Sequence, residues 1–238
     1  MKQLPLPIRL DQRASFDNFI VGDNRQALTA LRHLSSPDGE PQVYLWGSEP
    51  VGKSHLLQGL CLHAVKLGMP AMLLPLSSFG SHDHAVLENL ERYSIVCLDD
   101  IDHVCGLTGW AEALFHLINR LRQQGTRLVL TAHAPPDGLE TPLPDLASRL
   151  AWGPVFRLSP LRDDDLIRFV IRRGEGQGVT IPPEVVDYLI KFTRRDVMAM
   201  IEWVDRLDRE ALAQQRRVTV PFVRTLVTSS AGRRHPGH

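Results

Sequence analysis

The chain has 238 residues, of which 43% are hydrophobic and 23% charged, values typical of a globular protein with one large domain or a large and a small one. Its 27 basic and 27 acidic side chains give zero net charge, which argues against a protein that wraps DNA through a basic excess. No apolar run approaches the roughly eighteen residues of a membrane span, and no signal peptide begins the chain, so we expect a cytoplasmic protein without a membrane partner.

The first part of the chain alternates helical and strand-like segments. Asp23 is suited to cap a helix that ends before the turn at 35–39. The further predicted elements are strands at 42–46, 71–74, 94–98 and 127–131, with helices at 55–67 and 111–124. Short uninterrupted apolar runs that alternate with helices predict an α/β fold with a parallel sheet covered on both faces.

After about residue 158 the pattern becomes purely helical. We expect helices at 162–173, from Pro182 onward, at 195–213, and from a Thr219 cap through Leu226. The expected domains are an N-terminal peptide at 1–10, an α/β domain at 11–158, a small helical domain at 159–228 and a disordered tail at 229–238.

The three cysteines, Cys61, Cys97 and Cys105, form no CxxC pair. Their odd number and wide spacing predict reduced, buried thiols, neither a disulfide framework nor a zinc site. The histidines do not converge on a metal pattern either, because His82 and His84 have no second ligand pair at zinc spacing.

One stretch carries a specific chemical signal: Gly47-Ser48-Glu49-Pro50-Val51-Gly52-Lys53-Ser54 matches G-x4-G-K-[ST]. In such a loop the backbone N–H groups and the start of the next helix cradle phosphates, the lysine reaches the β and γ oxygens, and the serine hydroxyl binds Mg²⁺. The flanking strand and helix fit this interpretation. The alternative is a glycine turn without a ligand.

Two aspartates follow the apolar run at 94–98. We expect Asp99 to lie at the end of a strand beside the P-loop strand and to hold Mg²⁺ directly or through water. Asp100 stands where many ATPases have the glutamate that orients the attacking water, so hydrolysis by this chain alone is expected to be weak. The alternative is a solvated turn at the end of a strand.

Arg149 lies in the segment PDLASRL, which Asp145 is suited to cap as a short helix. One interpretation is an arginine finger that reaches the nucleotide of a neighbouring protein. The other is a local salt bridge to Asp145, which the spacing of four residues permits. Spacing alone favours the salt bridge.

Four segments together resemble a known family. Residues 15–22 (SFDNFIVG), 52–57 (GKSHLL), 98–101 (LDDI) and 146–153 (LASRLAWG) resemble, in order, the ATPase domain of the bacterial replication initiator DnaA. The resemblance covers roughly residues 10–228. It implies an AAA+ fold, in which a P-loop α/β domain is followed by a small all-α lid.

The N-terminal peptide narrows the resemblance. Gln3-Leu4-Pro5-Leu6-Pro7 resembles the motif by which proteins dock on the replication sliding clamp, and its prolines pre-set an extended backbone. The resemblance ends near residue 228, so we expect no DNA-binding helix-turn-helix domain and no sequence-specific DNA contact. A DnaA-like module with such a peptide resembles the Hda family, which joins the clamp and promotes hydrolysis of the initiator's ATP, preventing re-initiation.

The resemblance assigns residues to roles. Gly47 to Ser54 hold the phosphates of a resident nucleoside diphosphate, ADP or another, with Ser54 and Asp99 at Mg²⁺; the base lies near Phe19, Ile20 and Val21. His55 belongs to this site or packs at the start of the helix. Arg149 is the finger aimed at DnaA, and Gln3, Leu4 and Leu6 enter the clamp pocket. The finger implies a face-to-face contact between two ATPase domains. The sequence does not decide whether the chain also forms a homodimer or a higher oligomer.

The sequence also departs from the family pattern. His133 replaces the initiator's sensor aspartate, and Met198 replaces its lid arginine, with Arg194 or Arg195 as candidates to substitute. We take Arg195 as the nucleotide-binding candidate. These departures favour a regulator bound to a diphosphate over a stand-alone catalyst. Two alternatives stay open: a self-sufficient ATPase that loads helicase or remodels a replication partner, and an adaptor that the nucleotide only stabilises.

Overall fold

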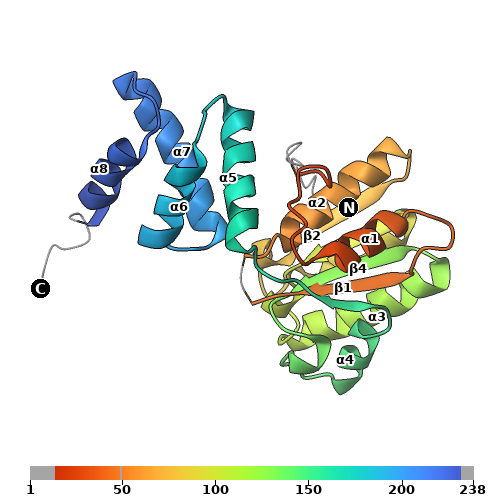
Figure 1. Cartoon of the computed structure of the whole chain (residues 1–238). Helices are drawn as coiled ribbons and strands as arrows, with labels where there is room; N and C mark the ends of the chain where they lie inside the picture. The colour runs from red at the N-terminus through yellow and green to blue at the C-terminus, as the bar shows by residue number, and fades with distance from the viewer. Residues whose placement is uncertain (1–13, 49, 232–238) are drawn as a thin grey trace, which may run out of the picture. The chain divides into compact units, whose positions relative to one another are not determined.

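The structure is a computed structural model that describes residues 14–48 and 50–231 (Figure 1). The chain divides into two compact units, with the boundary between Ser159 and Pro160. Gln3, Leu4, Leu6 and Glu49 lie outside the described residues. Within the described part, no helix is long and apolar enough to cross a membrane.

The described part of the first unit contains a five-stranded sheet in the order β2-β3-β4-β1-β5, with every neighbouring pair parallel. Its strands are β1 Gln42–Trp46, β2 Ala71–Pro75, β3 Ile95–Asp99, β4 Arg127–Ala132 and β5 Val155–Arg157. Four were predicted from their apolar runs. The edge strand β5 was not, because its three residues are exposed or half-buried and form no apolar run.

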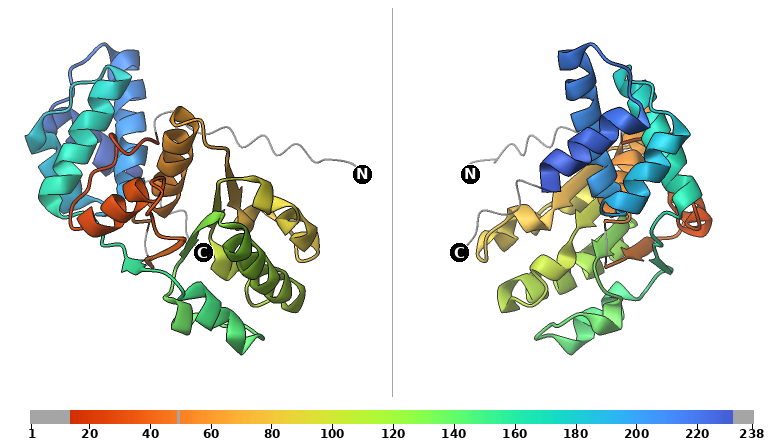
Figure 2. Two further views of the ribbon diagram at one scale, coloured as in Figure 1. Left: turned by 90° about the vertical axis from the view of Figure 1, so that its right-hand side faces the viewer. Right: turned by 60° about the vertical axis from the view of Figure 1, so that its left-hand side comes forward.

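Helices cover both faces of this sheet, as predicted (Figures 1 and 2). One face packs against α1 Arg25–His33 and α2 Lys53–Lys66, and the other against α3 Thr108–Gln124 and α4 Pro144–Leu150. Side chains along β1 alternate between the layers, with Tyr44 in the α3/α4 core and Val43 and Leu45 in the α1/α2 core. Short 3₁₀ turns join the elements at Leu76–Ser78, Asp83–Leu87, Leu90–Arg92, Ile101–His103 and Pro136–Gly138.

Two predicted helix caps are wrong. Asn24, not Asp23, occupies the cap position of α1, and its amide instead bonds the backbone of Ser159, donating at 3.0 Å and accepting at 2.7 Å. This link ties the start of α1 to the second residue after β5. At α4, Leu143 takes the cap position and Pro144 begins the helix, so Asp145 lies in the first turn.

The three cysteines are free and buried, as predicted. Cys61 on α2 and Cys97 on β3 meet in the core with their sulfur atoms 3.8 Å apart. This contact and burial raise the pKa of the Cys97 thiol, and burial raises that of Cys105 to about 11. Neither group is a thiolate at neutral pH.

The described part of the second unit is helical: α5 Asp163–Gln177, α6 Pro183–Phe192, α7 Val197–Gln214 and α8 Val220–Ala231. Asp196 caps α7 by accepting from the Ala199 N–H at 2.8 Å. Asp205 on α7 links this helix to α5 by accepting hydrogen bonds from Gln177 and Arg173. Burial opposes the charge of the Asp205 carboxylate, but these hydrogen bonds hold its pKa below the usual value. Helix α8 continues to Ala231, past residue 229 where the tail was expected to begin.

Candidate functional site

The P-loop lies where β1 ends and α2 begins. Gly52, the residue before α2, has φ 90°, and a Cβ built on it would lie 2.9 Å from the Phe19 ring. Lys53 is buried at 6% exposure and its Nζ donates to the Gly47 carbonyl at 2.7 Å. Ser54 is exposed in the first turn of α2. The loop thus brings together a left-handed glycine, a buried cation, an exposed hydroxyl and a helix N-terminus, which suits phosphate oxygens.

We expect Gly52→Ala to lower ADP affinity at least tenfold and to destabilise the chain by about 1–3 kcal/mol, because it combines left-handed strain with a clash against Phe19. Titration with a fluorescent ADP analogue and thermal unfolding measure the two effects. Gly68→Ala is the matched control, since Gly68 also has positive φ, at the far end of α2, but a Cβ there meets nothing within 4 Å. An affinity loss as large for Gly68→Ala would contradict this account of the loop.

Phe19 and His55 pack together beside this loop. The Phe19 ring contacts Gly52, and its centroid lies 5.7 Å from that of His55. The His55 Nε2 lies 2.9 Å from the Ser15 carbonyl, so His55 packs at the start of α2. Ile20 and Val21 are half-buried. The roles of Phe19, Ile20 and Val21 toward a base, and of His55 toward the nucleotide, stay predictions.

The acidic half of the site lies at the end of β3, but the expected neighbourhood was wrong. β4 lies between β1 and β3, so Asp99 is one strand removed from the P-loop strand. The intervening strand supplies Thr131, a fully buried residue whose hydroxyl donates to Asp99 Oδ1 and accepts from the Asp100 N–H at 3.0 Å. Thr131 therefore orients the Asp99 carboxylate, a role that its position at the end of an apolar run did not reveal.

Asp100 has a left-handed backbone, with φ 55°. Burial raises the pKa of its carboxyl, the Asp99 charge adds to this, and Lys53 and His133 oppose it. Close by, the Asp102 carboxylate accepts from the His133 N–H at 3.2 Å and lies 2.7 Å from its Nδ1. Asp100, Asp102 and His133 place ligand atoms within 4.8 Å of one another, a convergence that the histidine spacing missed because it joins residues 31 apart.

Arg149 lies in the last turn of α4, away from its own P-loop. Its carbonyl and that of Leu150 each accept a 2.9 Å hydrogen bond from the Gln42 amide. Gln42 begins β1, whereas the P-loop follows the other end of that strand, about 13 Å farther along. Within the described part of the chain, Arg149 has no ion pair and its buried Nε has no hydrogen-bond partner, so the salt bridge to Asp145 is not formed.

The two lid arginines both pair with carboxylates of the second unit. Arg195 Nε lies 2.5 Å from Asp163 Oδ1, and Arg194 Nε lies 3.3 Å from Asp196 Oδ2. Met198, the position at which the resemblance to the initiator implies a lid arginine, is 47% exposed on the first turn of α7. The assignment of Arg195 to the nucleotide stays a prediction.

Comparison with known proteins agrees with this architecture. The family model described as bacterial DnaA ATPase domain matches residues 10–157, and the model described as Hda, lid domain, matches residues 163–227. Domain III of the Thermotoga maritima replication initiation protein DnaA is 22% identical, with 89% of this chain and 94% of that chain covered and a TM-score of 0.78.

Two further solved structures share the fold. A replication initiator DnaA bound to AMPPCP and single-stranded DNA is 19% identical, with 87% of this chain and 69% of that chain covered and a TM-score of 0.73. The Thermotoga maritima RuvB Holliday junction branch migration motor is 19% identical, with 89% and 70% covered and a TM-score of 0.70. The parallel sheet, the P-loop and the two matched domain models lead to one conclusion: the chain belongs to the Hda family of DnaA-like AAA+ proteins.

Proposed function

We propose that this chain regulates replication initiation by binding ADP, docking on the sliding clamp and stimulating hydrolysis of the ATP held by DnaA. The observation that carries the proposal is the position of Arg149. Its backbone is bonded to the amino end of β1, and its own P-loop follows the carboxyl end. A guanidinium at that edge, without an ion pair among the described residues, suits a phosphate on a neighbouring molecule.

The diphosphate site is proposed from the P-loop. The N–H groups at the start of α2 and the Lys53 ammonium would bind phosphate oxygens. The exposed Ser54 hydroxyl and the Asp99 carboxylate, which Thr131 orients, fit a hard cation such as Mg²⁺. When bound, Mg²⁺ would neutralise phosphate charge.

Weak hydrolysis by the chain itself belongs to the same proposal. Asp100 carries a carboxylate one methylene shorter than the glutamate of many ATPases, and burial disfavours its charged form. His133, at the sensor position, pairs with Asp102. In this proposal the nucleotide of the chain holds the regulator in an active shape, and the reaction takes place on the initiator.

Clamp docking is proposed from the peptide at residues 3–7, which lies outside the described residues. Replacing Gln3 and Leu4 by alanine should reduce capture of the chain by immobilised clamp at least tenfold, because the pocket would lose an amide and an apolar anchor. The matched control replaces Ile8 and Arg9, the next residues outside the motif, and should bind as the parent does. Undiminished capture of the Gln3 and Leu4 variant would remove docking from the proposed function.

The assay for the whole proposal combines the chain, DNA-loaded clamp and ATP-loaded DnaA. We expect phosphate release to rise well above the rate of DnaA alone, and to fall back when the clamp is omitted. An unchanged rate in the full mixture would contradict the proposed function.

A further inference from the structure

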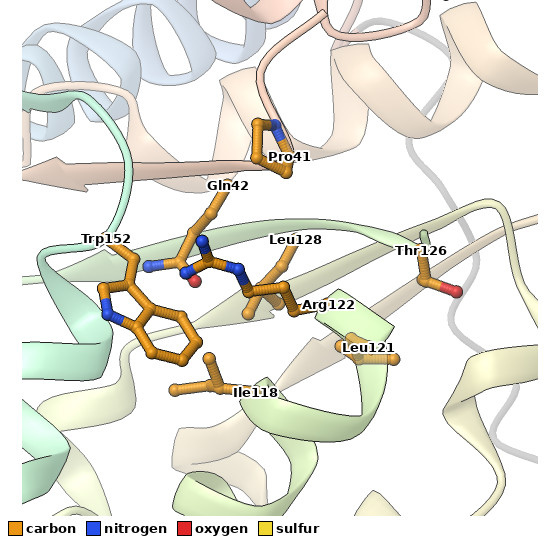
Figure 3. Close-up of a pocket in the computed structure, with 8 residues that line it drawn as sticks. All are labelled: Pro41, Gln42, Ile118, Leu121, Arg122, Thr126, Leu128 and Trp152. Carbon is orange, nitrogen blue, oxygen red and sulfur yellow. The ribbon is translucent and has the colours of Figure 1, made fainter. Parts of the chain in front are cut away.

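Two arginine side chains lie over the ring of Trp152. The guanidinium carbon of Arg122 lies 4.1 Å from the ring centroid and that of Arg149 lies 4.2 Å from it. Arg149 also lies 5.3 Å from the centroid of the Phe115 ring on α3. Trp152 is 36% exposed, so the cluster reaches the surface. Figure 3 shows the Arg122 side chain extending toward the Trp152 ring.

This contact constrains Arg149 without neutralising it. A carboxylate partner would cancel the charge and occupy the N–H donors, whereas an aromatic face attracts the flat guanidinium and leaves donors at its edge available. The donors of Arg149 are not engaged in an ion pair within the described residues. A long arginine side chain loses much conformational entropy when it is fixed. Because the rings already restrict the Arg149 side chain, less entropy is lost when a partner binds.

The backbone around Trp152 is anchored to β1. The Gln42 amide binds the carbonyls of Arg149 and Leu150, and a Cβ on Gly153 would overlap the Gln42 carbonyl oxygen at 1.9 Å. The cavity lined by Gln42, Arg122 and Trp152 measures about 40 Å³, far below the roughly 300 Å³ or more of ligand pockets (Figure 3). The backbone of the segment that contains Trp152 is therefore held against β1, next to a cavity much smaller than a ligand pocket.

We propose that Trp152 is a positioning residue that holds the Arg149 guanidinium in the orientation needed for the ATP of the partner. This proposal rests on the proposed function of Arg149. Arg122, on the same ring, helps to hold the indole in place and adds positive charge beside the finger. Trp152 acts through Arg149 and does not itself touch the nucleotide.

The first test compares Trp152→Leu and Trp152→Phe in the initiator assay, under single turnover and at saturating chain. We expect the maximal rate to fall about tenfold for Leu and less than threefold for Phe, which keeps an aromatic face. The half-saturating concentration should change less than twofold. An unchanged maximal rate for Trp152→Leu would overturn the proposal. A higher half-saturating concentration with an unchanged maximal rate would also overturn it, because Trp152 would then be a docking contact.

A double-mutant cycle separates the two proposals. Adding Trp152→Leu to Arg149→Ala should cause no further loss, because the ring acts only through that guanidinium; a second multiplicative loss would overturn positioning. If Arg149→Ala has no effect on the rate, the proposed function fails. If Arg149→Ala lowers the rate strongly but Trp152→Leu leaves it unchanged, only the positioning role of Trp152 is rejected. Arg32→Ala, which removes an exposed arginine over the Phe16 ring at 5.8 Å, is the matched control and should stay within twofold of the parent.

A measurement on the parent protein needs no folded variant at Trp152. The NMR signal of the Arg149 Nε–H, assigned by its loss in Arg149→Ala, should be shifted upfield by the ring current of the indole. A parent signal at the solvated position would overturn the proposal.

Discussion

Arg149→Ala is expected to bind ADP as the parent does and to lose about a thousandfold of its stimulation of ATP hydrolysis on DnaA. The guanidinium would stabilise charge that develops on the transferred phosphoryl group, and no other described residue of α4 offers a cation. Single-turnover phosphate release from ATP-loaded DnaA, with the clamp on DNA, measures the effect.

The control for this variant is Arg92→Ala. Arg92 is exposed just before β3, at the same edge of the sheet, and lies over the Tyr93 ring at 5.1 Å. Arg92→Ala removes one positive charge from the same edge of the sheet as Arg149→Ala does. It should leave the rate of phosphate release from DnaA within twofold of the parent. A loss as large as that of Arg149→Ala would mean that general positive charge, not a finger, drives the stimulation.

The stability of Arg149→Ala should change little. The side chain has no salt bridge within the described chain, so its removal forfeits stacking on Trp152 and Phe115, worth about 1 kcal/mol. Thermal unfolding should therefore show a midpoint within a few degrees of the parent. This separates loss of the finger from loss of the fold.

Lys53→Ala is expected to weaken ADP binding at least a hundredfold, because it removes the only cation of the described loop. It also leaves the Gly47 carbonyl without its hydrogen bond, which costs about 1 kcal/mol. At 100 times the dissociation constant, a ligand adds about 2.7 kcal/mol of stability to the parent. The rise in unfolding midpoint on adding ADP should thus disappear in the variant.

Lys66→Ala, at the exposed far end of α2, is the control for charge and helix. It should retain both the ADP affinity and the thermal shift of the parent. If nucleotide-free Lys53→Ala stays folded and stimulates DnaA fully, the adaptor alternative gains support. If parent protein hydrolyses ATP steadily without clamp or DnaA, the self-sufficient ATPase gains support.

The elements predicted best are those that are determined by residues adjacent in the sequence. The P-loop is contiguous, and a strand and a helix flank it in sequence as they do in space. Asp99 was found because it ends an apolar run. The order of the strands was not predictable in this way, because placing β4 between β1 and β3 depends on pairings between segments distant in the chain.

The contacts that define the candidate site are mostly distant in sequence. The hydrogen bond from Thr131 to Asp99 joins residues 32 apart, and that from Gln42 to Arg149 joins residues 107 apart. Spacing favoured a salt bridge between Arg149 and Asp145, yet in the fold the guanidinium lies over Trp152. Local spacing permits an ion pair, but the packing of α3 and the segment after α4 decides where the side chain lies. Its role as a finger stays a prediction.

In the proposed function, the ATP that is hydrolysed is bound to the partner and not to this chain. DnaA loaded with γ-labelled ATP, freed of excess nucleotide, is mixed with the chain in unlabelled ADP and with clamp on DNA, and labelled phosphate is counted. We expect the label to be released faster than from DnaA alone, in proportion to the chain added. Arg149→Ala should give no such increase. Labelled phosphate released only at the rate of DnaA alone, while the chain turns over free ATP in a parallel reaction, would contradict it.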